Sequence, residues 1–135
     1  MNAELQSGIG LERSLGTSLR KLLDNVGWLH DWQMAGPNGA RAARCDLLVV
    51  LPLPTGGNAL LCVELKNDLR PSMFRQIVDR PFAPPAHAKA VVRVLGLPSV
   101  SPRIAELCTE HGWGWFDLAG NCRLDVPGLL HVQHT

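Results

Sequence analysis

The chain has 135 residues, of which 46% are apolar and 19% charged, a composition that fits one globular domain and excludes disorder. The net charge is +1, so a nucleic-acid partner would have to be held by a local cluster of cations. The first residues lack a signal pattern, and no apolar run is long enough to cross a bilayer. We therefore expect a cytoplasmic protein that is not held in a membrane.

The first predicted element is an amphipathic helix that begins at Ile9 and stops at Gly27. Its apolar residues recur at helical spacing: Leu11, Leu15, Leu19, Leu22 and Val26. Glu12 and Gly16 lie one turn apart on its flank, where a small residue lets another backbone or a ligand approach. A solvated glutamate is the simpler interpretation of Glu12.

The next segment, WLHDWQM, is predicted to form a first edge strand, with its tryptophans as core or edge cover. It leads into a predicted turn, Gly36-Pro37-Asn38-Gly39.

Two apolar strands follow, over residues 46–51 and 59–66, and a loop rich in proline and glycine joins them. A hairpin folded about Thr55 sets Val50 against Leu60, Leu48 against Cys62, and Asp46 against Glu64. Both faces of this hairpin are apolar, which indicates a central sheet covered by helices on both sides. Lys66 projects on the same face as Glu64, because side chains alternate along a strand.

The remaining elements are predicted in the order helix, strand, helix and meander. A short helix contains Phe74 and Ile77 and ends before Pro81, and residues 89–97 form a buried strand. A helix capped by Ser101 stops at Gly112, and Asp117 caps the turn that joins the next two strands. The expected fold is α/β, with a central mixed sheet in α-β-β-β-α-β order and flanking helices. A C-terminal helix and a short β-meander follow it.

Two facing carboxylates repel each other unless a cation lies between them. Asp46 and Glu64 could hold Mg²⁺ through hard oxygen ligands, and the carbonyl of Leu65 offers another. Lys66 could steady an attacking water or the developing charge of a phosphate. An acid followed by a strand and E-x-K is thus the arrangement that metal-dependent phosphodiester cleavage needs.

The pattern RCD-x17-ELK resembles the PD-(D/E)XK nuclease superfamily, which includes restriction endonucleases and Holliday junction resolvases. The resemblance covers about residues 9–96, and Arg44-Cys45 stands where the family has a proline before the first acid. It implies a single restriction endonuclease-like domain over residues 1–135 and a Mg²⁺- or Mn²⁺-dependent DNA endonuclease. It also implies selectivity for DNA structure and a homodimer that cuts two strands. Glu12 and Gln76 match the positions of further catalytic side chains in the resolvase-type members.

Four arginines flank the proposed site in the sequence and could hold DNA phosphates: Arg41, Arg44, Arg70 and Arg75. Arginines at the ends of strands and helices are more often simply solvated, and E-x-K at the end of a strand is often part of a salt bridge. Two other functions therefore stay open. One is a catalytically silent nuclease fold that binds nucleic acid or regulates. The other is a defence or antitoxin component that acts through a protein partner.

Overall fold

The computed structural model describes residues 3–27, 29–127 and 129–134, with side chains from residue 10 onward. Four α-helices, one short 3₁₀ helix and seven strands occur within these residues. The helices are α1 (Ala3–Asp24), α2 (Pro37–Ala43), η1 (Pro71–Met73), α3 (Phe74–Val78) and α4 (Pro102–Glu110). The strands are β1 (Gln33–Met34), β2 (Leu47–Pro52), β3 (Asn58–Leu65), β4 (Ala90–Gly96), β5 (Gly114–Phe116), β6 (Cys122–Val126) and β7 (Leu130–His134).

The seven strands form one mixed sheet in which the spatial order follows the order along the chain. The strand pairs at both ends of the sheet are antiparallel, whereas β3, β4 and β5 run parallel. The parallel pairs need crossover connections, which α3 and α4 provide. The carboxyl ends of the three central strands therefore meet at one edge of the sheet.

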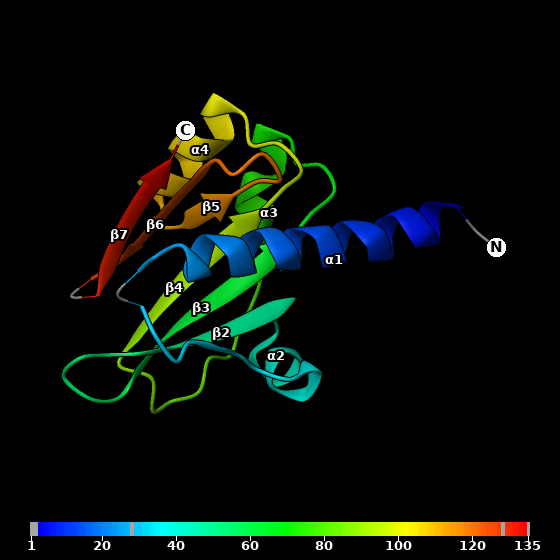
Figure 1. The fold of residues 1–135 in the computed structure, drawn as a ribbon. Helices are drawn as coiled ribbons and strands as arrows, with labels where there is room; N and C mark the ends of the chain where they lie inside the picture. The colour runs from blue at the N-terminus through cyan, green and yellow to red at the C-terminus, as the bar shows by residue number, and fades with distance from the viewer. Residues whose placement is uncertain (1–2, 28, 128, 135) are drawn as a thin grey trace.

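Helices cover both faces of the sheet, as the two-sided apolar pattern predicted (Figure 1). On one face, Leu15, Leu19 and Leu23 of α1 pack against apolar residues of β2 to β7. On the other face, α3 and α4 pack over β4 and β5, and α2 packs over β2 and β3. The α/β class and the mixed central sheet are confirmed.

The register of the β2–β3 hairpin is the predicted one, with Leu48 opposite Cys62 and Val50 opposite Leu60. The strand β2 begins only at Leu47, so Asp46 lies one residue outside it. The backbone N–H of Asp46 donates to the carbonyl of Val63 at 2.9 Å, which keeps Asp46 beside β3.

The predicted turn at Gly36-Pro37-Asn38-Gly39 is wrong, because α2 begins at Pro37. Proline suits the first turn of a helix, where its missing N–H costs nothing. Ala40 and Ala43 of this helix are buried against Leu48, Leu60 and Cys62 of the hairpin. Tertiary packing of these alanines therefore outweighs the turn preference of the preceding residues.

The predicted edge strand over WLHDWQM is reduced to the two residues of β1. Trp28 lies outside the described residues, as does Gly128 of the turn predicted before the last strand. The helix after the hairpin and the strand at residues 89–97 are confirmed as α3 and β4, and the helix capped by Ser101 is confirmed as α4. None of the helices in the described ranges combines the length and the apolar character that a membrane span requires.

Candidate functional site

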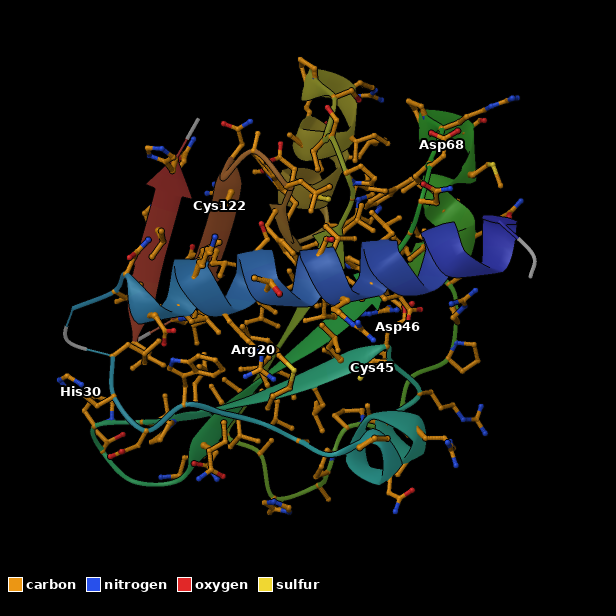
Figure 2. The ribbon with its side chains drawn as sticks, turned by 45° about the vertical axis from the view of Figure 1, so that its right-hand side comes forward. Arg20, His30, Cys45, Asp46, Asp68 and Cys122 are labelled. Carbon is orange, nitrogen blue, oxygen red and sulfur yellow. The ribbon has the colours of Figure 1, made fainter. Side chains whose placement is uncertain are left out.

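The candidate site lies at the carboxyl end of β3, where the start of β2 approaches it. Asp46 is exposed, and its Oδ2 accepts a hydrogen bond of 2.8 Å from the backbone N–H of Leu65. Figure 2 shows Cys45 and Asp46 next to each other at this end of the hairpin. The carboxylate of Asp46 thus anchors the last residue of β3 and has its other oxygen available for a further partner.

Glu64 is the most buried charged residue that the structure describes, with 2% of its surface exposed. Its Oε2 lies 3.2 Å from Nη1 of Arg80, which is half-exposed. Burial and the negative charge of Asp46 raise the pKa of Glu64, while the positive charges of Arg80, Lys66 and Arg93 lower it. The negative charge of Asp46 thus raises the pKa of Glu64, and a bound cation would relieve repulsion of this kind.

Lys66 follows β3 directly and is half-buried. Its N–H donates to the carbonyl of Gly96 at 3.0 Å, which joins the ends of β3 and β4 beyond their ladder. The positive charge of Lys66 lowers the pKa of Glu64, so the two side chains interact electrostatically. The structure therefore brings Asp46, Glu64 and Lys66 to one end of the hairpin.

Arg93 is a partly buried cation on the same face of the sheet as Glu64, and the sequence reasoning did not single it out. Its guanidinium donates to the carbonyls of Val78 at 2.9 Å and Ile77 at 3.2 Å, the last two residues of α3. It lies between two aromatic rings, 4.4 Å from the centre of Phe82 and 4.2 Å from that of Trp113. Arg93 thereby fixes the end of α3, two residues before Arg80.

The other predicted site residues lie at the surface, and none of them contacts Asp46 or Glu64 through a described hydrogen bond or ion pair. Glu12 is exposed on α1, and Gln76 is exposed on α3. Arg41, Arg44 and Arg70 are also exposed, and Arg75 forms a solvent-exposed ion pair of 3.7 Å with Asp79. These residues flank the candidate site in the sequence but make no described hydrogen bond or ion pair with its two carboxylates.

The oxygen ligands that the candidate site offers meet the needs of a hard cation such as Mg²⁺ only in part. Within the described residues, no group of three or more His, Cys, Asp and Glu side chains converges as a metal site. Mg²⁺ commonly uses one or two carboxylates and keeps several waters, so two acids and a carbonyl satisfy its minimum requirement. Asp46, Glu64 and the carbonyl of Leu65 are the groups that could hold it.

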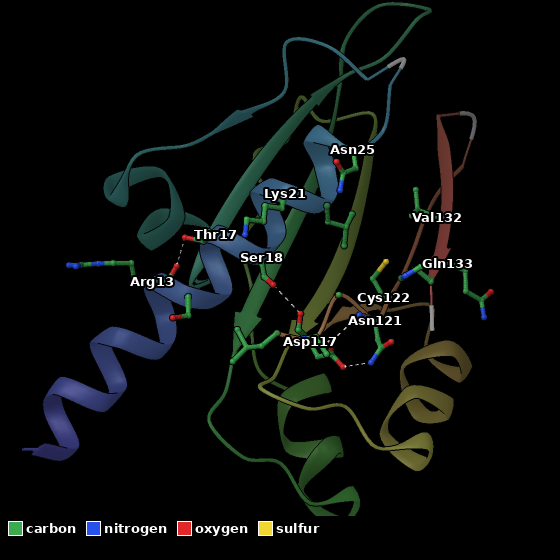
Figure 3. Close-up of a pocket in the computed structure, with 16 residues that line it drawn as sticks. Arg13, Thr17, Ser18, Lys21, Asn25, Asp117, Asn121, Cys122, Val132 and Gln133 are labelled. Atoms are coloured by element: carbon green, nitrogen blue, oxygen red, sulfur yellow. Dashed lines mark hydrogen bonds between the residues drawn. The ribbon is translucent and has the colours of Figure 1, made fainter.

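A groove lies elsewhere, between α1 and the turn from β5 to β6, with a volume of about 820 Å³. Ser18, Lys21 and Asn25 of α1 line one side, and residues 117–122 and 132–134 line the other (Figure 3). Asp117 is buried and accepts hydrogen bonds from the backbone of Ala119 and Asn121 and from the Asn121 side chain. The prediction that Asp117 caps this turn is confirmed.

Two arginines of the site, Arg80 and Arg93, were missed as site residues by the sequence reasoning. Arg93 left one signal, since it interrupts an otherwise apolar strand that must be buried on both faces. The sequence contains no such signal for Arg80, because the pairing of Arg80 with Glu64 depends on the path of the crossover through α3.

Comparison with protein-family models, with curated proteins and with solved structures found no match to this chain.

Proposed function

We propose that this protein is a Mg²⁺- or Mn²⁺-dependent DNA endonuclease with a PD-(D/E)XK-type site. One observation supports the proposal most directly. Asp46, Glu64 and Lys66 gather at one end of the β2–β3 hairpin, and the Asp46 charge raises the pKa of Glu64. The order α1-β1-β2-β3-α3-β4, with β4 parallel to β3, agrees with the core expected from the resemblance, apart from the inserted α2.

Each residue of the site has a distinct task in this proposal. Asp46 and Glu64 bind the cation together with the carbonyl of Leu65, and the bound cation supplies Lewis-acid chemistry. Lys66 steadies the attacking water or the charge that develops on the phosphate. Arg80 already neutralises Oε2 of Glu64, so Oε1 is the oxygen left for the cation.

DNA is the proposed substrate, with a preference for branched structures and a homodimer that cuts both strands. Arg41, Arg44, Arg70 and Arg75 would contact phosphates, since all four are exposed on segments next to the hairpin. Glu12 on α1 and Gln76 on α3 lie on helices that cover opposite faces of the sheet, so each would assist from its own side of the hairpin.

A second candidate function is a nucleic-acid-binding module without turnover, and one observation favours it. Both carboxylates have partners within the protein, Asp46 through the N–H of Leu65 and Glu64 through Arg80. Such a site is stable with no cation bound. A defence or antitoxin component that acts through a protein partner is a separate alternative.

A cleavage assay separates these functions. Purified protein is incubated with plasmid, linear and four-way-junction DNA, with Mg²⁺, with Mn²⁺ or with a chelator. We expect metal-dependent cutting, and we expect Glu64→Ala and Lys66→Ala each to lower its rate at least about a hundredfold. Glu110→Ala, an exposed acid on α4, is the matched control and should cut normally. Wild-type protein that binds DNA and cuts none of these substrates would favour the binding module.

A further inference from the structure

The groove between α1 and the turn from β5 to β6 is separate from the candidate site, since neither Asp46 nor Glu64 lines it. Its volume of about 820 Å³ falls within the range of about 300–1,000 Å³ that is typical of small-molecule sites. The helix α1 forms one wall, and the turn forms the other together with β6 and β7 (Figure 3). The groove is therefore large enough for a small organic ligand, and the proposed nuclease mechanism does not use it.

The wall formed by the turn is held in place by hydrogen bonds. The hydroxyl of Ser18 donates to the carbonyl of Asp117 at 3.2 Å, which joins α1 directly to the turn. Asp117 is 4% exposed, and its Oδ1 accepts from the N–H groups of Ala119 at 2.9 Å and Asn121 at 3.0 Å. Its Oδ2 accepts from the side-chain amide of Asn121 at 3.0 Å. The one acid among the described lining residues is therefore bonded within its own turn.

Positive charge lines the groove on the α1 side. Arg13, Thr17 and Lys21 are exposed and lie four residues apart, so they form one row along the helix. The two cations are about 12 Å apart along the helix axis, at the α-helical rise per residue. Neither of them forms an ion pair with another described residue. With histidine counted as neutral, the described lining residues carry two positive charges and one negative charge, so the groove favours an anion.

Apolar side chains also line the groove. Leu118 of the turn is 42% exposed and is one of two large apolar side chains that are exposed among the described residues. Leu22 of α1, Cys122 of β6 and Val132 of β7 line the groove as well, and they are buried or half-buried. A ligand with an apolar body would remove the exposed surface of Leu118 from water, which favours binding. The lining therefore suits a ligand that combines an apolar body with a negative charge.

We propose that this groove binds a small organic anion that has an apolar body and one acidic group. Lys21 contacts the acidic group, because it lies only three residues after Ser18, at the point where α1 meets Asp117. The apolar body covers Leu118, which follows Asp117 directly. Arg13 lies five residues before Ser18 and adds positive potential from the same row. Binding at this site does not depend on nuclease activity.

A fluorescent anion tests the proposal. Anilinonaphthalene sulfonate has an apolar body and one sulfonate group, and its emission rises when it leaves water. We expect this probe to bind the folded wild-type protein saturably. We expect octanoate to displace it, and we expect octylammonium, which has the same chain and the opposite charge, to displace it much less.

Two variants assign the binding to the groove. Lys21→Gln should weaken binding of the probe by about two- to fivefold, the range for one solvent-exposed charge pair. Leu118→Ser should weaken it at least about threefold, because less apolar surface leaves water on binding. Both replaced side chains are exposed, so each variant should keep the circular dichroism spectrum of the wild type.

Two further variants are matched controls. Arg20→Gln removes the positive charge next to Lys21, from a side chain that lies 3.6 Å from the sulfur of Met34 and does not line the groove. Met73→Ser removes the other exposed large apolar side chain, which is 45% exposed and also lies outside the groove. Both control variants should bind the probe as tightly as the wild type.

Several outcomes would overturn the proposal. The first is that the probe does not bind, or binds equally well to wild type, Lys21→Gln and Leu118→Ser. The second is that the control variants weaken binding as much, or that octylammonium displaces the probe as readily as octanoate, since adsorption to the whole surface would then explain the signal. If the probe does not bind while Lys21→Gln weakens duplex DNA binding and Arg20→Gln does not, the groove holds nucleic-acid phosphates instead.

Discussion

Nη1 of Arg80 lies 3.2 Å from Oε2 of Glu64 in an ion pair whose two ends differ in environment, since the carboxylate side chain is 3% exposed and that of arginine 47%. A buried charge that loses its partner pays for its desolvation without compensation. Arg80 therefore stabilises the buried charge of Glu64 more than Glu64 stabilises the half-exposed charge of Arg80.

The first prediction follows from this asymmetry. Arg80→Ala should lower the free energy of unfolding at neutral pH by about 1–3 kcal/mol, the cost of leaving a buried charged acceptor unpaired. Urea denaturation followed by circular dichroism measures the change. Arg75→Ala is the matched control, because its ion pair with Asp79 is exposed at both ends and should contribute less than about 1 kcal/mol. Equal losses in the two variants would show that Glu64 does not depend on Arg80.

The second prediction concerns pH. The pKa of Glu64 is raised in the folded protein by burial and by Asp46, so its ionised form opposes folding. The stabilising contribution of protonated Glu64 is complete below the ordinary glutamate pKa of about 4.3, and it is lost as the pH rises through the folded-state pKa. Glu64→Gln should therefore be more stable than wild type at pH 7, and this difference should shrink as the pH falls towards 4.

Free energies of unfolding measured across that range test the second prediction. Asp79→Asn is a suitable control, because the aspartate that it replaces is exposed and pairs with Arg75 at the surface. A difference between Glu64→Gln and wild type that is the same at every pH would mean that the variant acts through packing and not through charge.

The site illustrates which features can be predicted from a sequence. Two continuous apolar runs and the loop rich in proline and glycine between them define the hairpin, so the facing of Leu48 and Cys62 was correctly predicted. The ladder ends at Leu47 opposite Val63, and the N–H of Asp46 donates to the carbonyl of Val63, so the predicted facing of Asp46 and Glu64 is not part of it. Local signals also identified the cap at Ser101 and the turn held by Asp117, because each involves residues at most four positions apart.

Features that depend on distant packing could not be predicted in this way. The helix α2 exists because Ala40 and Ala43 are buried against the hairpin, and its first residues resemble a turn. The partners of Arg80 and Arg93 lie fifteen or sixteen residues away along the chain and meet them only through the crossover between β3 and β4. No periodicity in the sequence encodes such a pairing.

The third prediction concerns metal binding. Mg²⁺ or Mn²⁺ should raise the melting temperature, because a cation relieves the repulsion between Asp46 and Glu64 in the folded state only. Asp46→Asn should abolish the increase. This substitution keeps an oxygen that can accept the N–H of Leu65, so the loss reports on charge and not on the anchoring of β3. An equal increase in wild type and variant would mean that the ions bind elsewhere.

The last prediction separates DNA binding from catalysis. Affinity for DNA comes chiefly from cations that contact phosphates, so binding in the presence of a chelator should survive Glu64→Ala. Arg44→Gln should weaken it and lower the slope of its salt dependence by about one unit, the loss of one phosphate contact. Arg44 has a left-handed backbone with φ 61°, and glutamine keeps a Cβ there, so the substitution changes the charge without changing this strain.

Fluorescence anisotropy with a labelled duplex and a labelled four-way junction, at several salt concentrations, measures both quantities. Arg103→Gln is the matched control, since Arg103 lies on α4 and is already paired with Glu106 and Glu110. If Arg44→Gln and Arg103→Gln reduce affinity equally, the cations beside the hairpin have no special part in binding. If only Arg44→Gln weakens binding and Glu64→Ala does not, phosphate contacts are assigned to the hairpin side of the molecule, independently of whether the acids cut.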